Sequence, residues 1–492
     1  MSFLRSIMFV GTCSDAGKSI VNTAFCRIFK QDGYHPAPFK AQNMSLNSYS
    51  TPDGLEIGRA QAVQAEACGI APESDMNPVL LKPTNEQCSQ VVLNGKPVGN
   101  MSAKEYFMSN NKAELFNQAY AAYERLQARY SPIVLEGAGS ISEINLRERD
   151  ITNMRMALRT NAATYLVADI DRGGVFASVY GSITLLSEEE RKLIKGIIIN
   201  KFRGDISLFN EGRKIIHDLT GIPVVGVIPY FKDIYIEEED SVSLETKNTK
   251  AGSGKINVAI VLLKRLSNFT DFSTLERDER FHAYYTNNVE EIGKADIIIL
   301  PGTKNTISDL RNIRENGIAE AVIRAHKEGK KVIGICGGYQ MMGARIEDPD
   351  QIEGDMTAIP GLGILPLVTT MEPEKVTCQD QFTFRDHPET CKGYEIHMGR
   401  TTLLDGASES PLNRLHDGRT DGYFLNDKCW GTYLHGILDN DIVLNELAEG
   451  LTQATPTIFN YIDFKNQQYD KLADHVRTHV DLPYIYSTLK IK

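Results

Sequence analysis

The apolar positions of the chain fall in short, uninterrupted runs, separated by longer segments with helical spacing. In the first half of the chain these runs are Ser6–Val10, Ile133–Leu135, Thr164–Ala168, Gly196–Ile199 and Val224–Ile228. Strands that are apolar on both faces are typical of a parallel sheet covered by helices on both sides. The pattern therefore predicts an α/β domain built on a doubly wound, mostly parallel sheet.

A polar stretch interrupts this rhythm, and the same rhythm then begins again. The stretch runs from Glu237 to Lys255, with clustered acids at its start and Ala251-Gly252-Ser253-Gly254 near its end, which is typical of a linker between domains. We therefore expect two doubly wound α/β domains, at residues 1–236 and 256–441, with a linker at 237–255. Residues 442–492 are expected to form a C-terminal helical tail, to which the sequence assigns no role. The apolar runs of the second domain are Asn257–Leu263, Asp296–Leu300, Lys331–Ile335, Gly393–Met398 and Cys429–His435.

Charge and composition narrow the classes of function. The 53 basic and 64 acidic residues give a net charge of −11, which disfavours nucleic acid and anionic membranes as partners. The longest apolar run, Val258–Leu263, is far shorter than the ~20 residues that a membrane-spanning helix needs. No two of the eight cysteines are spaced as CxxC, which disfavours zinc and iron–sulfur sites. We expect a reduced, cytoplasmic protein that acts on small molecules.

A glycine-rich loop follows the first predicted strand. It reads Gly11-Thr12-Cys13-Ser14-Asp15-Ala16-Gly17-Lys18-Ser19, with one residue more than the common GxxxxGK(S/T) phosphate loop. Backbone N–H groups around Thr12 and Gly17 would surround a phosphate chain, Lys18 would face the terminal phosphates, and Ser19 would bind Mg²⁺. The loop therefore predicts ATP binding, the alternative being a chance glycine-rich turn. Asn200, at another strand end, is a candidate for contact with the adenine edge.

Acidic residues at other strand ends are candidates for the metal and the acid substrate. Glu136 ends the strand Ile133–Leu135 and is expected to share Mg²⁺ with Ser19, the alternative being a helix cap. Asp53 and Glu56 are weaker candidates for metal ligands. Asp53 is equally well explained as a turn residue, and Glu56 as an acid at the start of a helix. Asp171, beside a Gly pair, is either a substrate contact or part of a solvated turn.

The second predicted domain contains a cysteine at a sharp turn between a strand and a helix. Cys336 lies in Gly334-Ile335-Cys336-Gly337-Gly338, and flanking glycines permit the strained backbone of a nucleophile elbow. His435, at a second strand end, is the candidate base. Backbone N–H groups near Gly302 and Gly337 are candidates for an oxyanion hole or glutamine pocket. The alternatives are a buried structural thiol and an ordinary Pro-Gly turn.

These motifs carry a resemblance to known families. GICGGYQMMG and TYLHGIL resemble the class I glutamine amidotransferase domain in its cobalamin-pathway branch. GTCSDAGKS and VLEGAGS resemble the ATP-binding domain of dethiobiotin synthetase and its relatives, whose phosphate loop also has the extra residue. The stretches PFKAQNMSLNSY, EIGRAQAVQAEA and MNPVLLKP add to the resemblance to the cobalamin branch, which extends over about residues 1–440.

The resemblance implies ATP- and glutamine-dependent amidation of the b, d, e and g propionate carboxylates of adenosylcobyrinic acid a,c-diamide, giving adenosylcobyric acid. It implies that Cys336 is the nucleophile, His435 its partner, and Asp150 part of a loop near the acid substrate. Most class I amidotransferases carry a glutamate two residues after the histidine, but Ile437 occupies that position here. The group that orients His435 is therefore left open.

Two other functions fit the same motifs. The first is cobyrinic acid a,c-diamide synthase, which has the same domain types and acts on a different pair of carboxylates. The second is a P-loop regulatory ATPase with a non-catalytic glutaminase-like module, although the presence of both Cys336 and His435 argues against it.

Overall fold

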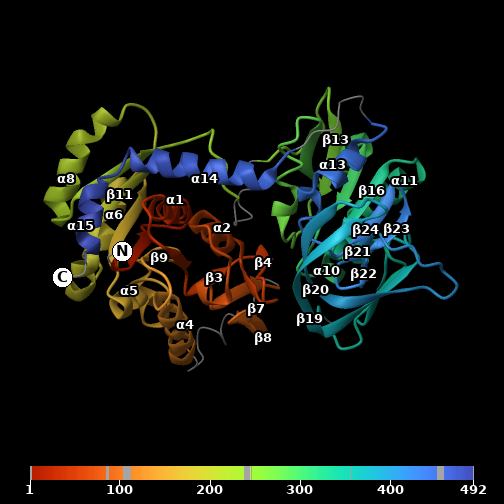
Figure 1. The fold of residues 1–492 in the computed structure, drawn as a ribbon, viewed down its shortest axis with the longest axis horizontal. Coiled ribbons are helices and arrows are strands. Elements are labelled where there is room, and N and C mark those ends of the chain that lie inside the picture. The colour runs from red at the N-terminus through yellow and green to blue at the C-terminus, as the bar shows by residue number, and fades with distance from the viewer. Residues whose placement is uncertain are drawn as a thin grey trace.

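The computed structural model describes residues 3–84, 88–102, 112–237, 244, 247–354, 356–451 and 459–490. Two α/β bodies lie side by side, and a long C-terminal helix extends along the first of them (Figure 1). Each body contains a six-stranded sheet with helices around it, as the apolar pattern predicts.

The sheet of the first body is entirely parallel, and β1 lies near its middle. Alternate residues of β1 enter two different cores, because Met8 and Val10 face one layer of helices while Ile7 and Phe9 face the other. The doubly wound arrangement is therefore confirmed. In order across the sheet the strands are β12 (Val224–Pro229), β11 (Ile194–Phe202), β10 (Ala163–Asp169), β1 (Ile7–Gly11), β9 (Ile133–Glu136) and β2 (Ala37–Phe39).

Helices cover both faces of this sheet. Helix α1 packs on the face of Ile7 and Phe9, whereas α4, α5, α6 and α8 contribute to the core on the face of Met8 and Val10. The helices of the first body are α1 (Lys18–Gln31), α2 (Arg59–Cys68), α4 (Lys112–Gln127), α5 (Met154–Thr160), α6 (Val175–Thr184), α7 (Glu188–Leu193) and α8 (Asn210–Thr220), with 3₁₀ turns η1 (Ser74–Met76), η2 (Ile144–Arg149) and η3 (Ile206–Phe209).

The main sheet of the second body is parallel except at one edge, where β23 pairs antiparallel with β24. Its order is β14 (Phe281–Thr286), β13 (Ile256–Val261), β15 (Ile297–Leu300), β16 (Lys331–Ile335), β24 (Cys429–Thr432) and β23 (Tyr423–Asn426). The surrounding helices and turns are η5 (Phe269–Phe272), α9 (Val289–Lys294), α10 (Thr306–Glu315), α11 (Ile318–Lys327), α12 (Gly337–Met342), η6 (Ile437–Asp439) and α13 (Asp441–Ala448).

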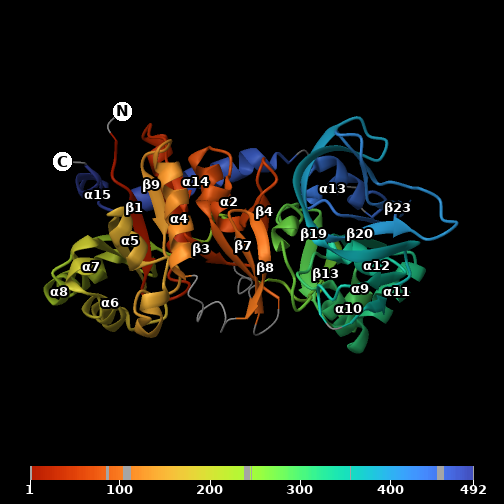
Figure 2. The same ribbon diagram turned by 90° about the horizontal axis from the view of Figure 1, so that it is seen from below.

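Smaller elements, mostly antiparallel, lie between the two bodies. The first body contributes the sheet β3 (Gln42–Met44), β6 (Val79–Pro83), β7 (Cys88–Leu93) and β8 (Lys96–Ser102), and the pair β4 (Ser48–Ser50) and β5 (Glu56–Gly58). The second body contributes the long hairpin of β19 (Leu367–Phe384) and β20 (Thr390–Leu403), with β17 (Arg345–Glu347), β18 (Ala358–Pro360), β21 (Asn413–Leu415) and β22 (Thr420–Asp421). Figure 2 shows this hairpin facing β4 and β8.

The predicted tail divides between the two bodies. Helix α13 packs Val443, Leu444 and Leu447 into the second core. The chain then returns, and α14 (Tyr461–Arg477) and α15 (Leu482–Leu489) place Leu472, Ile485 and their neighbours in the core around Phe9. Asp470 of α14 accepts two hydrogen bonds from Arg27 of α1, at 2.7 and 2.9 Å. The last helices of the chain therefore belong structurally to the first body.

Glu237, the first residue of the predicted linker, is buried. The Glu237 carboxylate accepts hydrogen bonds from Arg59 at 2.6 and 2.8 Å and from the Tyr461 hydroxyl at 2.7 Å. Residues 238–243 and 245–246 of the polar stretch lie outside the described residues. Glu237 thus joins α2 to the returning helix α14.

Candidate active sites

The backbone turns sharply at Cys336, between β16 and α12. Its φ of +51° is unusual for a residue with a side chain, and such strain persists where the surrounding structure enforces it. A Cβ on Gly338 would lie 1.9 Å from the carbonyl oxygen of Leu300, so glycine is required there. The geometry matches the nucleophile elbow that the sequence predicts. The Cys336 thiol lies 3.6 Å from the carbonyl oxygen of Ile396, on β20.

His435 lies beside this cysteine and is bonded to Asp271. Oδ2 of Asp271 lies 2.7 Å from Nδ1 of His435. The other carboxylate oxygen, Oδ1, accepts a hydrogen bond from the backbone N–H of Gly436 at 3.0 Å. Burial alone would lower the pKa of His435, but Asp271 and Cys336 outweigh it and raise that pKa to about 10. The three side chains place a thiol, an imidazole and a carboxylate together, which is the arrangement that the predicted nucleophile and base require.

Asp271 answers the question that Ile437 left open. Ile437 is fully buried in η6 and belongs to the second hydrophobic core. The carboxylate comes instead from η5, after β13 and far from His435 in sequence. Asp271 is not among the residues predicted from the sequence, although polar residues that follow the first strand of a parallel sheet are a usable signal.

The two predicted pocket glycines lie close to these residues. A Cβ on Gly302 would lie 3.0 Å from Cε1 of His435, and a Cβ on Gly337 would lie 2.7 Å from the side chain of Thr303. The loop after β15 therefore packs directly against the cysteine turn and the histidine. Whether these backbone groups bind an oxyanion is left as a prediction.

A cavity of about 50 Å³ opens beside Cys336 and is lined by both bodies. Lys82 of β6 belongs to the first body, whereas Lys304, Gln340, Glu353 and Lys375 belong to the second. Burial lowers the pKa of Lys375 to about 7 and raises that of Glu353 to about 7. The space next to the thiol is thus a buried, charged chamber at the domain boundary.

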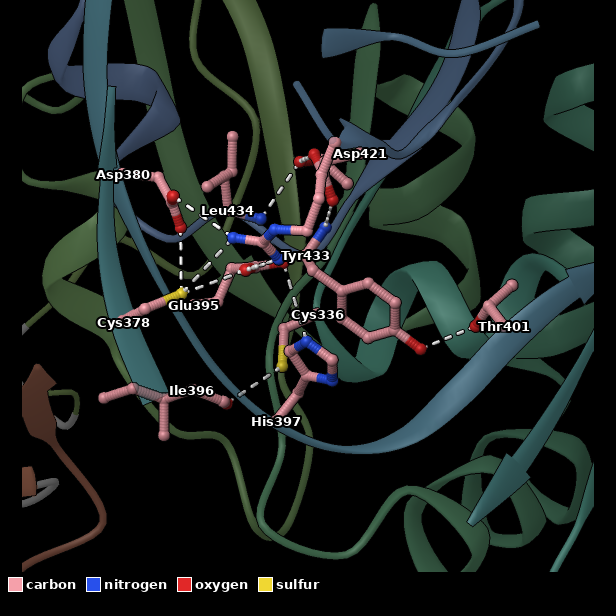
Figure 3. A network of polar contacts seen from close by, with 12 residues as sticks. Cys336, Cys378, Asp380, Glu395, Ile396, His397, Thr401, Asp421, Tyr433 and Leu434 are labelled. Carbon is pink, nitrogen blue, oxygen red and sulfur yellow. Dashed lines mark hydrogen bonds and ion pairs between the residues drawn. The ribbon is translucent and has the colours of Figure 1, made fainter. Parts of the chain in front are cut away.

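A polar network surrounds the strand that carries Ile396 (Figure 3). Among the described residues, one group of three side chains has the spacing of potential metal ligands. Its ligand atoms lie within 4.8 Å of one another and belong to Cys378, Asp380 and Glu395. Arg419 lies 3.0 Å from Glu395 and 3.3 Å from Asp380. Because a guanidinium already neutralises these carboxylates, the contacts fit an ion-pair cluster that braces β19 against β20.

The phosphate loop has the predicted form between β1 and α1. Lys18 is buried, and its ammonium donates to the backbone oxygens of Cys13 at 3.0 Å and Gly139 at 2.9 Å. Burial lowers the pKa of Lys18 to about 8. Asn200 of β11 donates to the oxygen of Ala16 at 3.0 Å, and a Cβ on Gly17 would clash with its amide.

Thr12 and Asn200 both border the loop. The backbone oxygen of Thr12 accepts a hydrogen bond from the hydroxyl of Ser140, at 2.8 Å. The structure therefore brings Thr12, Gly17, Lys18 and Asn200 together around one loop. The contact of Asn200 with adenine stays a prediction.

The predicted metal pair, Ser19 and Glu136, is also brought together. The Ser19 hydroxyl donates to Oε1 of Glu136 at 2.8 Å, and Lys40 donates to the same oxygen at 2.8 Å. Gln64 of α2 donates to the other oxygen at 2.6 Å. These neighbours, Lys40 foremost among them, hold the pKa of Glu136 below its usual range against the effect of burial. A hydroxyl and a carboxylate oxygen at this spacing suit the hard oxygen ligation of Mg²⁺.

The two weaker metal candidates lie elsewhere. Glu56 is in β5 and not at a helix start, because α2 begins at Arg59. Its carboxylate pairs with Lys82 at 2.7 Å and with Lys375 at 2.5 Å, which places it at the domain boundary. Asp53 is an exposed turn residue bonded to Thr51. The structure brings neither carboxylate to Ser19 or Glu136.

The candidates for the acid substrate are separated. Asp150 accepts the N–H groups of Thr152 at 2.8 Å and Asn153 at 3.1 Å, and burial raises its pKa. Asp171 pairs with Arg203 at 2.6 Å, and this arginine holds its pKa below the usual range. Both contacts explain local structure, and a role in binding substrate stays a prediction.

Comparison with known proteins places this architecture in a family. A model described as the CobQ/CobB/MinD/ParA nucleotide binding domain matches residues 7–244, and one described as the CobB/CobQ-like glutamine amidotransferase domain matches residues 257–443. A Parabacteroides distasonis protein named Cobyric acid synthase is 70% identical over 491 residues, which cover 99% of each chain. The chain belongs to the cobyric acid synthase family. Relatives of the same name in Bacteroides fragilis and Syntrophobacter fumaroxidans are 62% and 47% identical, over 98–99% of each chain.

Membership in this family confirms the resemblance that the motifs indicate. The nucleotide-binding domain precedes the glutamine amidotransferase domain, in the order that the sequence predicts. In the part of the chain that the structure describes, no helix has both the length and the apolar character needed to cross a bilayer.

Proposed function

We propose that the chain is a glutamine-hydrolysing amidoligase that converts four propionate carboxylates of adenosylcobyrinic acid a,c-diamide to amides in cobalamin biosynthesis. The observation that carries this proposal is the 70% identity, over 99% of both chains, to a protein named Cobyric acid synthase. The assembled Cys336, His435 and Asp271 and the formed phosphate loop support it. ATP and glutamine are its co-substrates, and the cytoplasm is its compartment.

In the first body, ATP activates the carboxylate. A carboxylate is a poor acyl donor because hydroxide would have to leave, whereas an acyl phosphate loses phosphate readily. Lys18 neutralises charge on the transferred phosphoryl group, and Thr12, Gly17 and Asn200 fix the loop that holds the nucleotide. Ser19 and Glu136 are the residues that would hold Mg²⁺, which supplies further charge neutralisation when it is bound. Asp150 and Asp171 are proposed to face the acid substrate.

In the second body, Cys336 attacks the side-chain amide of glutamine. His435 takes the thiol proton and delivers it to the leaving nitrogen, so that ammonia departs and a thioester is left for water to hydrolyse. Asp271 holds the imidazole in orientation. The backbone near Gly302 and Gly337 is proposed to stabilise the oxyanion. The charged chamber that both bodies line is the proposed exit for ammonia, which then displaces phosphate from the activated carboxylate.

Mass spectrometry tests this function directly. Adenosylcobyrinic acid a,c-diamide is incubated with the protein, ATP, Mg²⁺ and glutamine. Four successive replacements of a carboxylate by an amide are expected. In a parallel incubation with cobyrinic acid as the substrate, amidation at only the a and c positions would favour the related diamide synthase instead. Unchanged corrinoid in both incubations, with corrinoid-independent ATP hydrolysis, would indicate a regulatory ATPase.

A further inference from the structure

Asn268 faces the second ring nitrogen of His435. Because Nδ1 is bonded to Asp271, Nε2 is the atom that must accept the thiol proton of Cys336. The amide nitrogen of Asn268 lies 3.2 Å from this Nε2. The catalytic histidine is therefore contacted on both nitrogens by one short segment, residues 268–271.

The orientation of the Asn268 amide is fixed by the first body. The backbone N–H of Ser48, on β4, donates to Oδ1 of Asn268 at 3.0 Å. Since a backbone N–H can only donate, the oxygen of the amide must face Ser48 and its NH₂ group must face His435. Asn47 accepts the neighbouring N–H of Phe269 at 3.1 Å, so two first-body residues hold the segment.

This contact conflicts with the ion pair that catalysis requires. An N–H group of Asn268 facing Nε2 is favourable only while Nε2 presents a lone pair. Once the Cys336 proton arrives, two N–H groups oppose each other across 3.2 Å. Asp271 and Cys336 favour that proton, so Asn268 must withdraw for the pair to form.

The restraint is connected to the nucleotide site through α2. The backbone oxygen of Asn47 accepts the N–H of Arg59, the first residue of α2, at 3.1 Å. One turn further along this helix, Gln64 donates to Glu136, the acid bonded to Ser19. The helix thus connects the segment that holds Asn268 with the acid of the nucleotide site.

We propose that Asn268 is a positioning residue that restrains His435 under the control of Asn47 and Ser48, so that glutamine hydrolysis waits for a loaded synthetase domain. Binding of substrates in the first body shifts α2 and the 47–48 segment, and Asn268 then releases Nε2. This inference rests on the proposed glutaminase activity and assigns its control to one interdomain contact.

The test measures glutamate release with glutamine alone and with glutamine, ATP, Mg²⁺ and corrinoid. Wild type is expected to show slow hydrolysis alone and strong stimulation by the other substrates. Asn268→Leu, which has similar volume and no amide, should raise the unstimulated rate at least about tenfold and reduce the stimulation ratio toward one. Asn47→Ala, which does not touch His435, should move both quantities in the same direction.

Two controls keep the outcome decisive. Ammonium-driven amidation by both variants should stay within about twofold of wild type, which reports that the synthetase domain is folded. Asn426→Ala, a change at the exposed end of β23 in the same body, should leave the stimulation ratio unchanged. This inference alone would be overturned if both variants released glutamate from glutamine alone no faster than wild type and were still stimulated by the other substrates. A wild-type chain that hydrolyses no glutamine under any condition would overturn the proposed function as well.

Discussion

Nδ1 of His435 lies 2.7 Å from Oδ2 of Asp271, although 164 residues separate the two in the chain. The carboxylate comes from the turn after β13, the cysteine from the end of β16, and the histidine from just beyond β24. These three strands are parallel members of one sheet, so their carboxyl ends lie at one edge. The carboxylate that contacts His435 therefore comes from the turn after β13 and not from the position two residues after the histidine, which Ile437 occupies.

Replacing Asp271 by asparagine is expected to lower the kcat of glutamine-driven amidation about 100-fold or more, because the imidazole loses both its orientation and its charge partner. The Asp271 carboxylate raises the pKa of His435 and so stabilises the imidazolium that forms when the thiol proton of Cys336 moves to Nε2. Without that charge the proton leaves at lower pH, so the alkaline limb of glutamine hydrolysis should shift toward neutrality. A pH–rate profile identical to wild type would contradict this role.

Replacing Cys336 by serine should abolish glutamine-driven amidation and leave ammonium-driven amidation within about twofold of wild type. The thiol is needed only to release ammonia, whereas the synthetase chemistry lies in the first body. Steady-state rates with each nitrogen source check this. Cys88→Ser, the same change in β7, is the matched control. Equal loss with both nitrogen sources would argue against separate sites.

Replacing Lys18 by alanine should impair amidation and spare the hydrolysis of glutamine. Loss of the buried cation in the phosphate loop is expected to reduce amidation at least about 100-fold with either nitrogen source. Hydrolysis of glutamine in the absence of ATP should continue at the wild-type rate. Lys30→Ala, at the exposed end of the same helix, should change neither rate. ATP binding measured by calorimetry would show whether the loss arises at the nucleotide.

Replacing Glu56 by glutamine should destabilise the domain boundary by about 3–5 kcal/mol, because Lys82 and Lys375 would lose their buried carboxylate. These two lysines hold the pKa of Glu56 well below its usual range against the effect of burial. Its contribution is therefore present above the ordinary glutamate pKa and is lost as the pH falls through the lower folded value. Denaturant unfolding at pH 7 and in acid measures the difference.

The control for this change is Glu315→Gln, which breaks an exposed pair with Arg311 on α10. A surface pair of that kind contributes at most about 1 kcal/mol. If both variants unfold at the same denaturant concentration, the buried cluster does not stabilise the boundary.

Replacing Leu472 by alanine should lower the free energy of unfolding by about 2–5 kcal/mol, because the side chain is fully buried against the first body. Ile462, in the same helix but 57% exposed, should tolerate alanine with little loss. Thermal unfolding followed by calorimetry checks both. Equal melting temperatures for the two variants would mean that α14 is not part of the first core.

The sequence was sufficient for the central strands of both parallel sheets, because long apolar runs such as Ile197–Ile199 and Ile297–Leu300 are buried on both faces. It did not predict β3 to β8 or β19, and the run Gly393–Met398, which was expected in the second parallel sheet, lies instead in β20 of the antiparallel hairpin. Their half-polar residues, as in Lys375–Gln381, contact the other body across a domain boundary that no local pattern describes. Tertiary packing decides such strands.

The candidate site divides in the same way. Lys18, Ser19 and Cys336 sit in compact motifs, so the loop geometry follows from neighbouring residues. Asp271 and Asn268 act on His435 only because β13 and β24 belong to one sheet. Glu56 resembled a metal ligand because nothing near it in sequence reveals Lys375, 319 residues away.

The return of α14 and α15 makes the glutaminase domain an insertion within the synthetase domain. The backbone N–H of Arg5 bonds to the oxygen of Leu489 at 2.8 Å, so the two ends of the chain meet on the same body. During synthesis, the residues of the second body therefore leave the ribosome before α14 and α15, which complete the core of the first body. A nascent chain could therefore fold the domain that supplies ammonia before the domain that consumes it is complete. Joining the two ends by a short peptide and opening the chain between α13 and α14 would allow the first body to be completed before the second.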